Sequence, residues 1–129
     1  MIEYKLFEWN TFFQMALLYN LSILFFNRFF TNNKLSEAYP EIFSKFSQVI
    51  IILLGFVYYF AGVTSKCKEL FIMFAIIKVL YFFSGVYWMF HRSHTVKFDK
   101  FPMEWIFMRI YGIGDLFFGI YFYLYSTLL

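Results

Sequence analysis

Residues 75–82 read AIIKVLYF, with a single charge, Lys78, inside a long apolar stretch. The whole stretch covers about 70–90 and therefore has the length of roughly 20 residues that a helix needs to cross a bilayer. Lys78 lies about eight residues from its start and about twelve from its end, too deep for its side chain to reach the headgroups easily. An unpaired charge at that depth costs roughly 2.5–3.5 kcal/mol on insertion scales. We therefore expect Lys78 to have a partner inside the membrane.

The composition also favours a membrane protein. Of the 129 residues, 62% are hydrophobic and 15% are charged, whereas soluble domains are about 45–50% apolar and about 25% charged. A small soluble domain could not bury 22 Phe and 11 Tyr, because it covers only about two thirds of its surface. The net charge of +3 comes from basic residues scattered over separate links. Nucleic-acid binding, which needs a continuous basic face, is not expected.

Four stretches are long and apolar enough to span a membrane as helices: about 8–30, 46–64, 70–90 and 104–127. Their apolar residues run continuously, whereas the strands of a membrane barrel alternate apolar and polar residues. The short link TSKCKE at 64–69 predicts that the second and third helices are antiparallel neighbours. We predict an all-α fold with one domain over 1–129, an integral membrane bundle of four antiparallel transmembrane helices.

The ends of these stretches carry further membrane signals. Trp9, Trp88 and Trp105 lie near the predicted span ends, where aromatic belts form. Pro102 suits the first turn of the last helix. Six Lys and Arg residues in the first and third links, against three on the other side, favour both termini outside the cell.

The other deep ionisable residue is Asp115, in the stretch YGIGDLFFGIYF at 111–122. Counting from the predicted helix midpoints at about 1.5 Å per residue places Lys78 and Asp115 within roughly 5 Å in height. Gly112 and Gly119 stand at i−3 and i+4 of Asp115, so a neighbouring backbone can come close. We predict an intramembrane ion pair, which serves either a functional site or the choice of helix faces that meet.

Other polar and small residues are predicted to face the same interior. The second helix carries Gln48, Ile52, Gly55, Tyr59 and Gly62 at helical spacing, and the first carries two amides seven residues apart. Such residues either hold helices together or contact a substrate. The candidate interior or packing residues are Gln48, Tyr59, Asn20, Asn27, Gly112, Gly119 and Tyr81.

Signals for other sites are weak. His91 and His94 are one turn apart in HRSH at 91–94, a candidate metal pair without a third ligand fixed by the pattern. Arg109 could reach the headgroups or pair with Glu104. The sequence contains no phosphate-binding loop, nucleophile elbow or HExxH motif, so no cofactor is expected and an enzyme is less favoured.

The lysine in IIKVL at 76–80, together with GIGDLFFGIYF at 112–122, resembles small bacterial four-helix membrane proteins that are loosely DoxX-like. The likeness covers mainly residues 50–125. It implies a multi-pass protein of the bacterial inner membrane in which Lys78 and Asp115 are the matching positions. It implies no established activity.

Two functions are compatible with these observations. The favoured one is binding or passage of a small molecule or proton in a polar interior around Lys78 and Asp115. The alternative is a structural or accessory membrane subunit in which the pair only fixes helix packing. Because four helices enclose little volume, a homodimer is one arrangement that we consider.

Overall fold

The computed structural model describes residues 2–31, 33–91, 99–100 and 102–129, and every regular element within these ranges is an α-helix. Four helices are long and three are short turns of helix between the first two long ones. In chain order they are α1 (Ile2–Leu21), α2 (Ile23–Phe26), α3 (Lys34–Ala38), α4 (Pro40–Phe43), α5 (Lys45–Thr64), α6 (Lys68–His91) and α7 (Pro102–Thr127).

Three of these helices, α5, α6 and α7, are long and apolar enough to cross a membrane in the part of the chain that the structure describes. They contain 20, 24 and 26 residues, and their bounds agree closely with the predicted 46–64, 70–90 and 104–127. The prediction of an all-helical chain with membrane-type helices is therefore confirmed at this level.

The starts of these helices follow from local sequence. The hydroxyl oxygen of Ser44 accepts a hydrogen bond from the Ser47 backbone N–H at 3.2 Å, which caps α5. Pro102 opens α7, as its missing N–H and fixed φ favour. Only Ser65, Lys66 and Cys67 separate α5 from α6, so the chain turns back sharply between them. The predicted packing of these two helices as neighbours is not among the main contacts, because α5 packs along α1 and α6 along α7.

The predicted first helix, about 8–30, is wrong as one continuous span. α1 ends at Leu21, and the helical path stops again after Phe26. Arg28, Phe29 and Phe30 then have φ angles of 49°, 55° and 68°, a left-handed region that disfavours side chains with a Cβ. This stretch contains no glycine or proline from which the turn could be predicted.

Polar groups account for the break. The side-chain oxygen of Asn27 accepts a hydrogen bond from the Phe30 backbone N–H at 3.1 Å and so holds the left-handed turn.

α1 begins earlier than predicted and includes Glu3, Lys5 and Glu8 in its first two turns. With these residues, α1 is not among the helices that are apolar enough to span a membrane.

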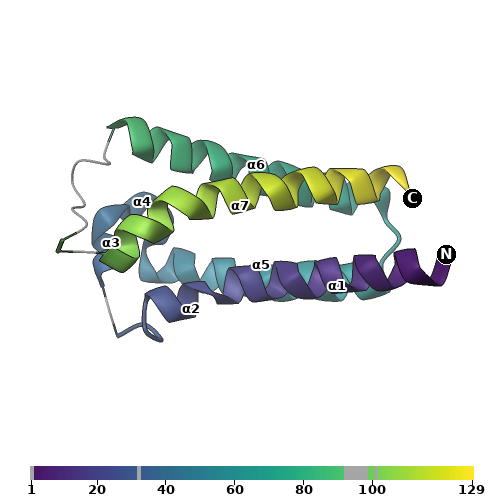
Figure 1. The fold of residues 1–129 in the computed structure, drawn as a ribbon, viewed down its shortest axis with the longest axis horizontal. Coiled ribbons are helices and arrows are strands. Elements are labelled where there is room, and N and C mark those ends of the chain that lie inside the picture. The colour runs from purple at the N-terminus through teal and green to yellow at the C-terminus, as the bar shows by residue number, and fades with distance from the viewer. Residues whose placement is uncertain (1, 32, 92–98, 101) are drawn as a thin grey trace.

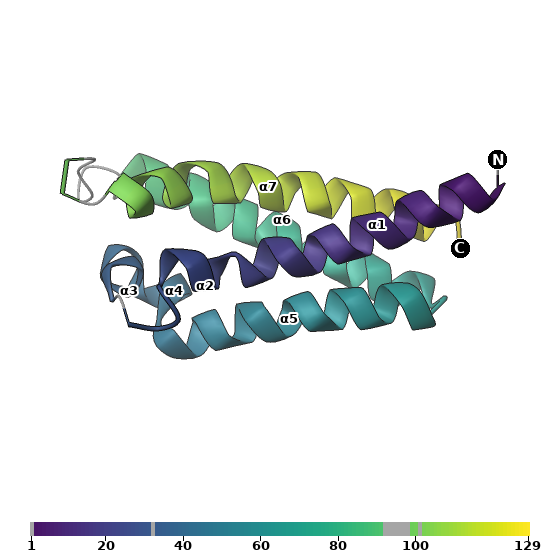
Figure 2. The ribbon, with the colours of Figure 1, turned by 60° about the horizontal axis from the view of Figure 1, so that its bottom comes forward.

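The long helices lie in two pairs (Figure 1, Figure 2): α6 packs along α7, and α1 packs along α5. Both chain termini lie at one end, and α3 and α4 lie at the other end. We call the segment from Asn27 to Ser44, which contains α3 and α4, the connector. Glycines bring α1 close to α5, because a Cβ on Gly55 would lie 2.8 Å from the Asn20 Cβ and a Cβ on Gly62 would overlap the Phe13 ring.

The buried apolar residues form two clusters, one toward the connector and one toward the termini. On α6, Ala75 belongs to the terminal cluster and Trp88 to the connector cluster; on α7, Phe118 and Tyr111 are divided in the same way. Lys78 and Asp115 come between these members in the sequence. A polar layer therefore separates two apolar ones.

Candidate functional site

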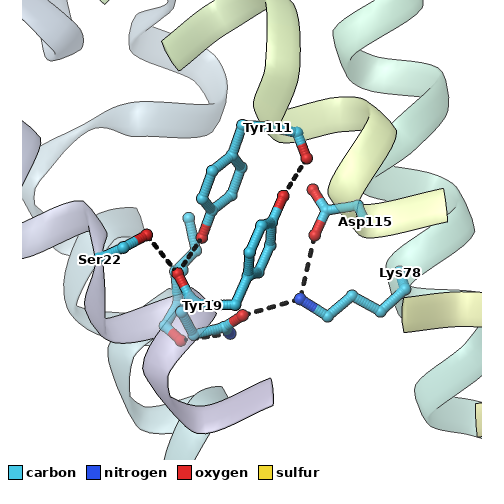
Figure 3. Close-up of polar contacts among 7 residues, drawn as sticks. Tyr19, Ser22, Lys78, Tyr111 and Asp115 are labelled. Carbon is cyan, nitrogen blue, oxygen red and sulfur yellow. Dashed lines mark hydrogen bonds and ion pairs between the residues drawn. The ribbon is translucent and has the colours of Figure 1, made fainter. Parts of the chain in front are cut away.

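The predicted pair of Lys78 and Asp115 is confirmed as a buried ion pair. Lys78 Nζ donates to Asp115 Oδ1 at 3.0 Å, and the two side chains are 2% and 3% exposed (Figure 3). Both residues lie near the middle of long helices, α6 and α7. The charges therefore meet far from either helix end.

Asn20 of α1 is the third member of this site. Lys78 Nζ donates to Asn20 Oδ1 at 2.7 Å, while Asn20 Nδ2 donates to the Ile51 backbone carbonyl of α5 at 2.8 Å. The second bond fixes the orientation of the amide, so that its oxygen faces the ammonium. We call Lys78, Asp115 and Asn20 the central cluster.

Three aromatic rings surround the ammonium. Lys78 Nζ lies 4.8 Å from the ring centroid of Tyr19, 5.1 Å from that of Tyr58 and 5.5 Å from that of Phe118. Ring faces within about 6 Å attract a cation, more strongly when water is excluded. The three rings thus stabilise the charge of an ammonium that is excluded from water.

Tyr19 and Tyr111 join α1 to α7 beside the central cluster (Figure 3). The Tyr19 hydroxyl donates to the Tyr111 backbone carbonyl, and the Tyr111 hydroxyl donates back to the Tyr19 carbonyl at 3.4 Å. Their rings stack with centroids 4.4 Å apart. The Tyr19 carbonyl also accepts from the Ser22 hydroxyl at 2.5 Å, so the end of α1 has its backbone oxygen satisfied.

Glycines of α7 make room for this site. A Cβ on Gly119 would lie 3.2 Å from the Lys78 Cβ, so Gly119 lets α6 approach at the level of the lysine. A Cβ on Gly114 would overlap the Tyr19 ring. Gly112 instead faces Gly85 of α6, where an added Cβ on Gly85 would lie 3.5 Å from the Gly112 Cα. The predicted packing roles of Gly112 and Gly119 agree with these contacts.

The predicted inward position of Tyr59 is wrong by one residue. Tyr58 is fully buried and faces Lys78, whereas Tyr59 is half-buried at the edge of the terminal cluster. Spacings of three and of four residues are both close to the helical period of 3.6, so the stripe could pass through either tyrosine. The buried face of α5 is Gln48, Ile51, Gly55, Tyr58 and Gly62.

Gln48 and Asn27 are buried as predicted, but in a second polar site at the connector end. Asn27 Nδ2 donates to Gln48 Oε1 at 2.5 Å. Gln48 Nε2 donates to the Phe43 carbonyl at 2.6 Å and to the Ser36 hydroxyl at 3.0 Å. We call Asn27, Gln48 and Ser36 the connector network. The predicted single polar interior is therefore two separate sites.

A small cavity of about 20 Å³ borders Asp115. Its lining includes the hydroxyl-bearing residues Tyr81 and Ser84 of α6, Tyr111 of α7 and Tyr39 of the connector. A volume of about 10–15 Å³ or more is enough for one water molecule. Tyr81, a predicted interior residue, is half-buried at this wall.

The candidate histidine pair is described only in part. His91 is exposed at the end of α6 and lies against the ring of Tyr87, with centroids 4.4 Å apart. His94 lies outside the described residues. No group of three His, Cys, Asp or Glu side chains that could hold a metal ion occurs within the described ranges.

Sequence reasoning missed several residues of the site: Tyr19, Tyr58, Tyr111, Phe118 and Gly114. One signal was present, because Gly114 directly precedes Asp115 in GIGD and marks a position without a side chain beside the carboxylate. The aromatic residues gave no such signal, because aromatic residues are 28% of this chain.

Comparison with known proteins finds no family model, no curated protein and no solved structure that matches this chain. The resemblance to DoxX-like proteins stays a prediction.

Proposed function

We propose that this chain is an integral membrane protein of the bacterial inner membrane whose helices α1, α5, α6 and α7 cross the bilayer antiparallel to one another. The length and apolar character of α5, α6 and α7 support this arrangement. α1 is more polar, but Tyr19 and Asn20 turn toward the other long helices and bond with them. A helix whose polar groups are paired inside a bundle can lie in lipid.

Within this bundle we propose that the Lys78–Asp115 pair binds and releases a proton. The observation that carries this proposal is the water-sized cavity at Asp115, next to a buried ion pair. A water molecule there can accept a proton from the aqueous phase as it passes one to a carboxylate oxygen of Asp115, so that the water stays neutral and Asp115 becomes a neutral carboxylic acid. The reverse step returns the proton to the water. Asn20 and the aromatic rings keep the Lys78 ammonium in place while its counter-charge is absent.

The size of the cavity favours a proton over a larger ligand. Small-molecule sites usually enclose about 300–1,000 Å³, whereas the space at Asp115 is about 20 Å³. The aromatic side chains of Tyr19, Tyr58 and Phe118 fill the other sides of the ammonium. A proton, carried by one water molecule, is the ligand that fits this space.

The second candidate is a purely structural role, and a specific observation favours it. Lys78 on α6 contacts Asp115 on α7, Asn20 on α1 and the Tyr58 ring on α5. One ammonium thus joins every long helix, and buried charges can fix which helix faces meet. In this case the pair keeps the same charge state at all times.

Infrared spectroscopy of the protein in lipid bilayers separates the two roles. If Asp115 takes up a proton, lowering the pH adds the carboxylic-acid carbonyl band of this buried group to those of the other Asp and Glu residues, and Asp115→Asn removes that band alone. The change to Asn keeps an oxygen that can accept from Lys78, so the folded protein remains. Glu69→Gln is the matched control, because Glu69 is an exposed carboxylate at the start of α6 and its loss leaves the band unchanged.

Vesicles containing the protein and a pH-sensitive dye provide the second measurement. If protons that bind Asp115 also cross the membrane, a pH gradient across the vesicle membrane decays faster with wild-type protein and with the Glu69→Gln variant than with Asp115→Asn. An Asp115 that shows no acid band at any pH at which the protein stays folded contradicts the proton proposal. If, in addition, Asp115→Asn lowers the stability and exchanging the charges by Lys78→Asp and Asp115→Lys restores it, the structural role is supported.

A further inference from the structure

A groove of about 240 Å³ runs over the outer surface where α6 and α7 meet. Gly85 and Gly112 form its floor, because neither helix has a side chain at this contact. Its walls are apolar side chains, among them Phe82, Val86 and Ile113. A trough of this kind, between two membrane-type helices, matches the shape and chemistry of a lipid acyl chain.

One charged residue, Arg109 of α7, lines the same groove. Its Cα lies about 10 Å along the helix from Pro102, at roughly 1.5 Å per residue. Arg109 Nη1 donates to the Trp105 backbone carbonyl at 3.3 Å, and the guanidinium lies 3.9 Å from the centroid of the Trp105 ring. The side chain therefore turns back toward the connector end of the molecule.

The guanidinium lies at the level where lipid headgroups are expected. It lies against the ring of the partly exposed Trp105 in the second turn of α7, and tryptophans near span ends mark the membrane–water interface. A long basic side chain that turns toward the interface in this way places its charge among the headgroups. The apolar groove continues from there toward the bilayer centre.

Arg109 makes no ion pair with a carboxylate in the part of the chain that the structure describes. Residues 92–98 and 101, outside that part, contain neither Asp nor Glu. Glu3 and Glu8 belong to the first turns of α1, at the opposite end of the molecule from the connector (Figure 1). The chain thus offers a cation above an apolar trough without an anion of its own to neutralise it.

We propose that this groove binds an anionic phospholipid. The phosphate accepts hydrogen bonds from the Arg109 guanidinium, and one acyl chain lies over Gly85 and Gly112. A lipid whose headgroup has a net negative charge is favoured over a zwitterionic one, because the Arg109 charge has no carboxylate partner here. This inference rests on the membrane embedding of α6 and α7. Gly85 and Gly112 line both the groove and the cavity at Asp115, but Arg109 lines the groove and not that cavity, so variants of Arg109 test the lipid site separately from the proton site.

Native mass spectrometry of the purified full chain, titrated with phosphatidylglycerol or phosphatidylcholine, tests the proposal. We expect one phosphatidylglycerol to bind about fivefold more tightly than phosphatidylcholine, the ratio given by about 1 kcal/mol per basic residue near anionic lipid. Arg109→Gln removes this preference, and Arg109→Lys keeps part of it. Lys45→Gln is the matched control, because it removes an exposed basic residue at the connector end and leaves the preference intact.

The floor of the groove can be tested separately. Gly85→Ala adds a methyl group at an ordinary contact distance from α7, so the helices keep their spacing while the trough becomes shallower. We expect weaker binding of both lipids with the preference between them unchanged. Asp115→Asn leaves lipid binding unchanged, which distinguishes failure of this proposal from failure of the proton site. Equal binding of the two lipids by wild-type protein, a preference that survives Arg109→Gln, or displacement of the lipid by inorganic phosphate alone would overturn it.

Discussion

The central cluster and the connector network are both buried and polar, but they differ in charge and in the groups that they bond to. The connector network consists of uncharged amides and a hydroxyl that bond to backbone groups, such as the Phe43 carbonyl and the Phe30 N–H. The central cluster contains two charges, and the Lys78 ammonium bonds to side chains of two other regular helices, Asp115 of α7 and Asn20 of α1. One site lies where the chain is irregular, and the other lies where it is helical.

This difference indicates why each site is present. Around the connector, backbone groups cannot pair within a helix and need side-chain partners, especially where water is scarce. At Lys78 and Asp115 the backbone is already paired within α6 and α7, so the charges there satisfy no backbone need. Apolar residues could fill the same space. The central charges therefore call for an explanation beyond the integrity of the helices.

The largest expected effect comes from removing one central charge. Asp115→Ala leaves the Lys78 ammonium buried without its carboxylate, and breaking a buried pair in this way costs about 3–5 kcal/mol. Reversible unfolding in mixed detergent micelles measures the loss. The double variant Lys78→Met with Asp115→Leu removes both charges, and we expect it to recover most of the stability. A double variant as unstable as Asp115→Ala would mean that the charges themselves hold the helices together.

The connector network should respond in the opposite way to apolar replacement. Gln48→Leu leaves the Asn27 amide nitrogen without its acceptor and removes one of the two donors to the Phe43 carbonyl, the other being the Ser36 hydroxyl. We expect a loss of about 3 kcal/mol, at the upper end for an unsatisfied buried group. Adding Asn27→Leu should not restore stability, because the Phe30 backbone N–H then loses its acceptor, the Asn27 side-chain oxygen. The same unfolding assay applies. Full recovery in this double variant would remove the contrast between the two sites.

The wall of the central cluster can be tested with two neighbouring glycines. Gly114→Ala places a methyl group in the Tyr19 ring, whereas Gly112→Ala meets its nearest atoms at 3.8 Å. We expect Gly114→Ala to lose about 2 kcal/mol through overpacking, and the matched Gly112→Ala to lose far less. Similar losses for both would show that α1 does not approach α7 through the Tyr19 ring.

The smallest predicted effect concerns the two adjacent tyrosines of α5. Tyr58→Leu removes a ring that faces the Lys78 ammonium at 5.1 Å, and we expect a loss of about 1 kcal/mol from that interaction. Tyr59→Leu changes a half-buried residue and should cost less. Tyr58→Phe keeps the ring face and should behave like wild type. A larger loss of stability for Tyr59→Leu than for Tyr58→Leu would mean that Tyr59, and not Tyr58, faces Lys78.

The ion pair could be predicted because depth in a bilayer is a strong constraint. Lys78 and Asp115 are isolated charges near the middle of long apolar stretches, and a charge in lipid needs a partner at the same height. The predicted glycines on α7 followed from their spacing to Asp115. These inferences needed only the position of each residue along its own helix.

The rest depended on rotation and on breaks in the helices. Tyr58 and Tyr59 differ by about 100° around α5, and the sequence pattern allows either. Asn20 and Asn27 were placed on one face because they are seven residues apart, but the turn after α2 sends them to different sites. Three consecutive left-handed residues without glycine give no recognisable sequence signal.

The residues that bond to α1 lie far along the chain, and this has a consequence for biogenesis. The hydrogen-bond partner of Asn20, Lys78, comes 58 positions later in the chain, and the partner of Tyr19, Tyr111, comes 92 positions later. A nascent chain therefore exposes these groups long before their partners leave the ribosome. In the proposed four-span arrangement, α1 would complete its polar contacts only when the last helix arrives, so the docking of the first helix would be the closing step of assembly.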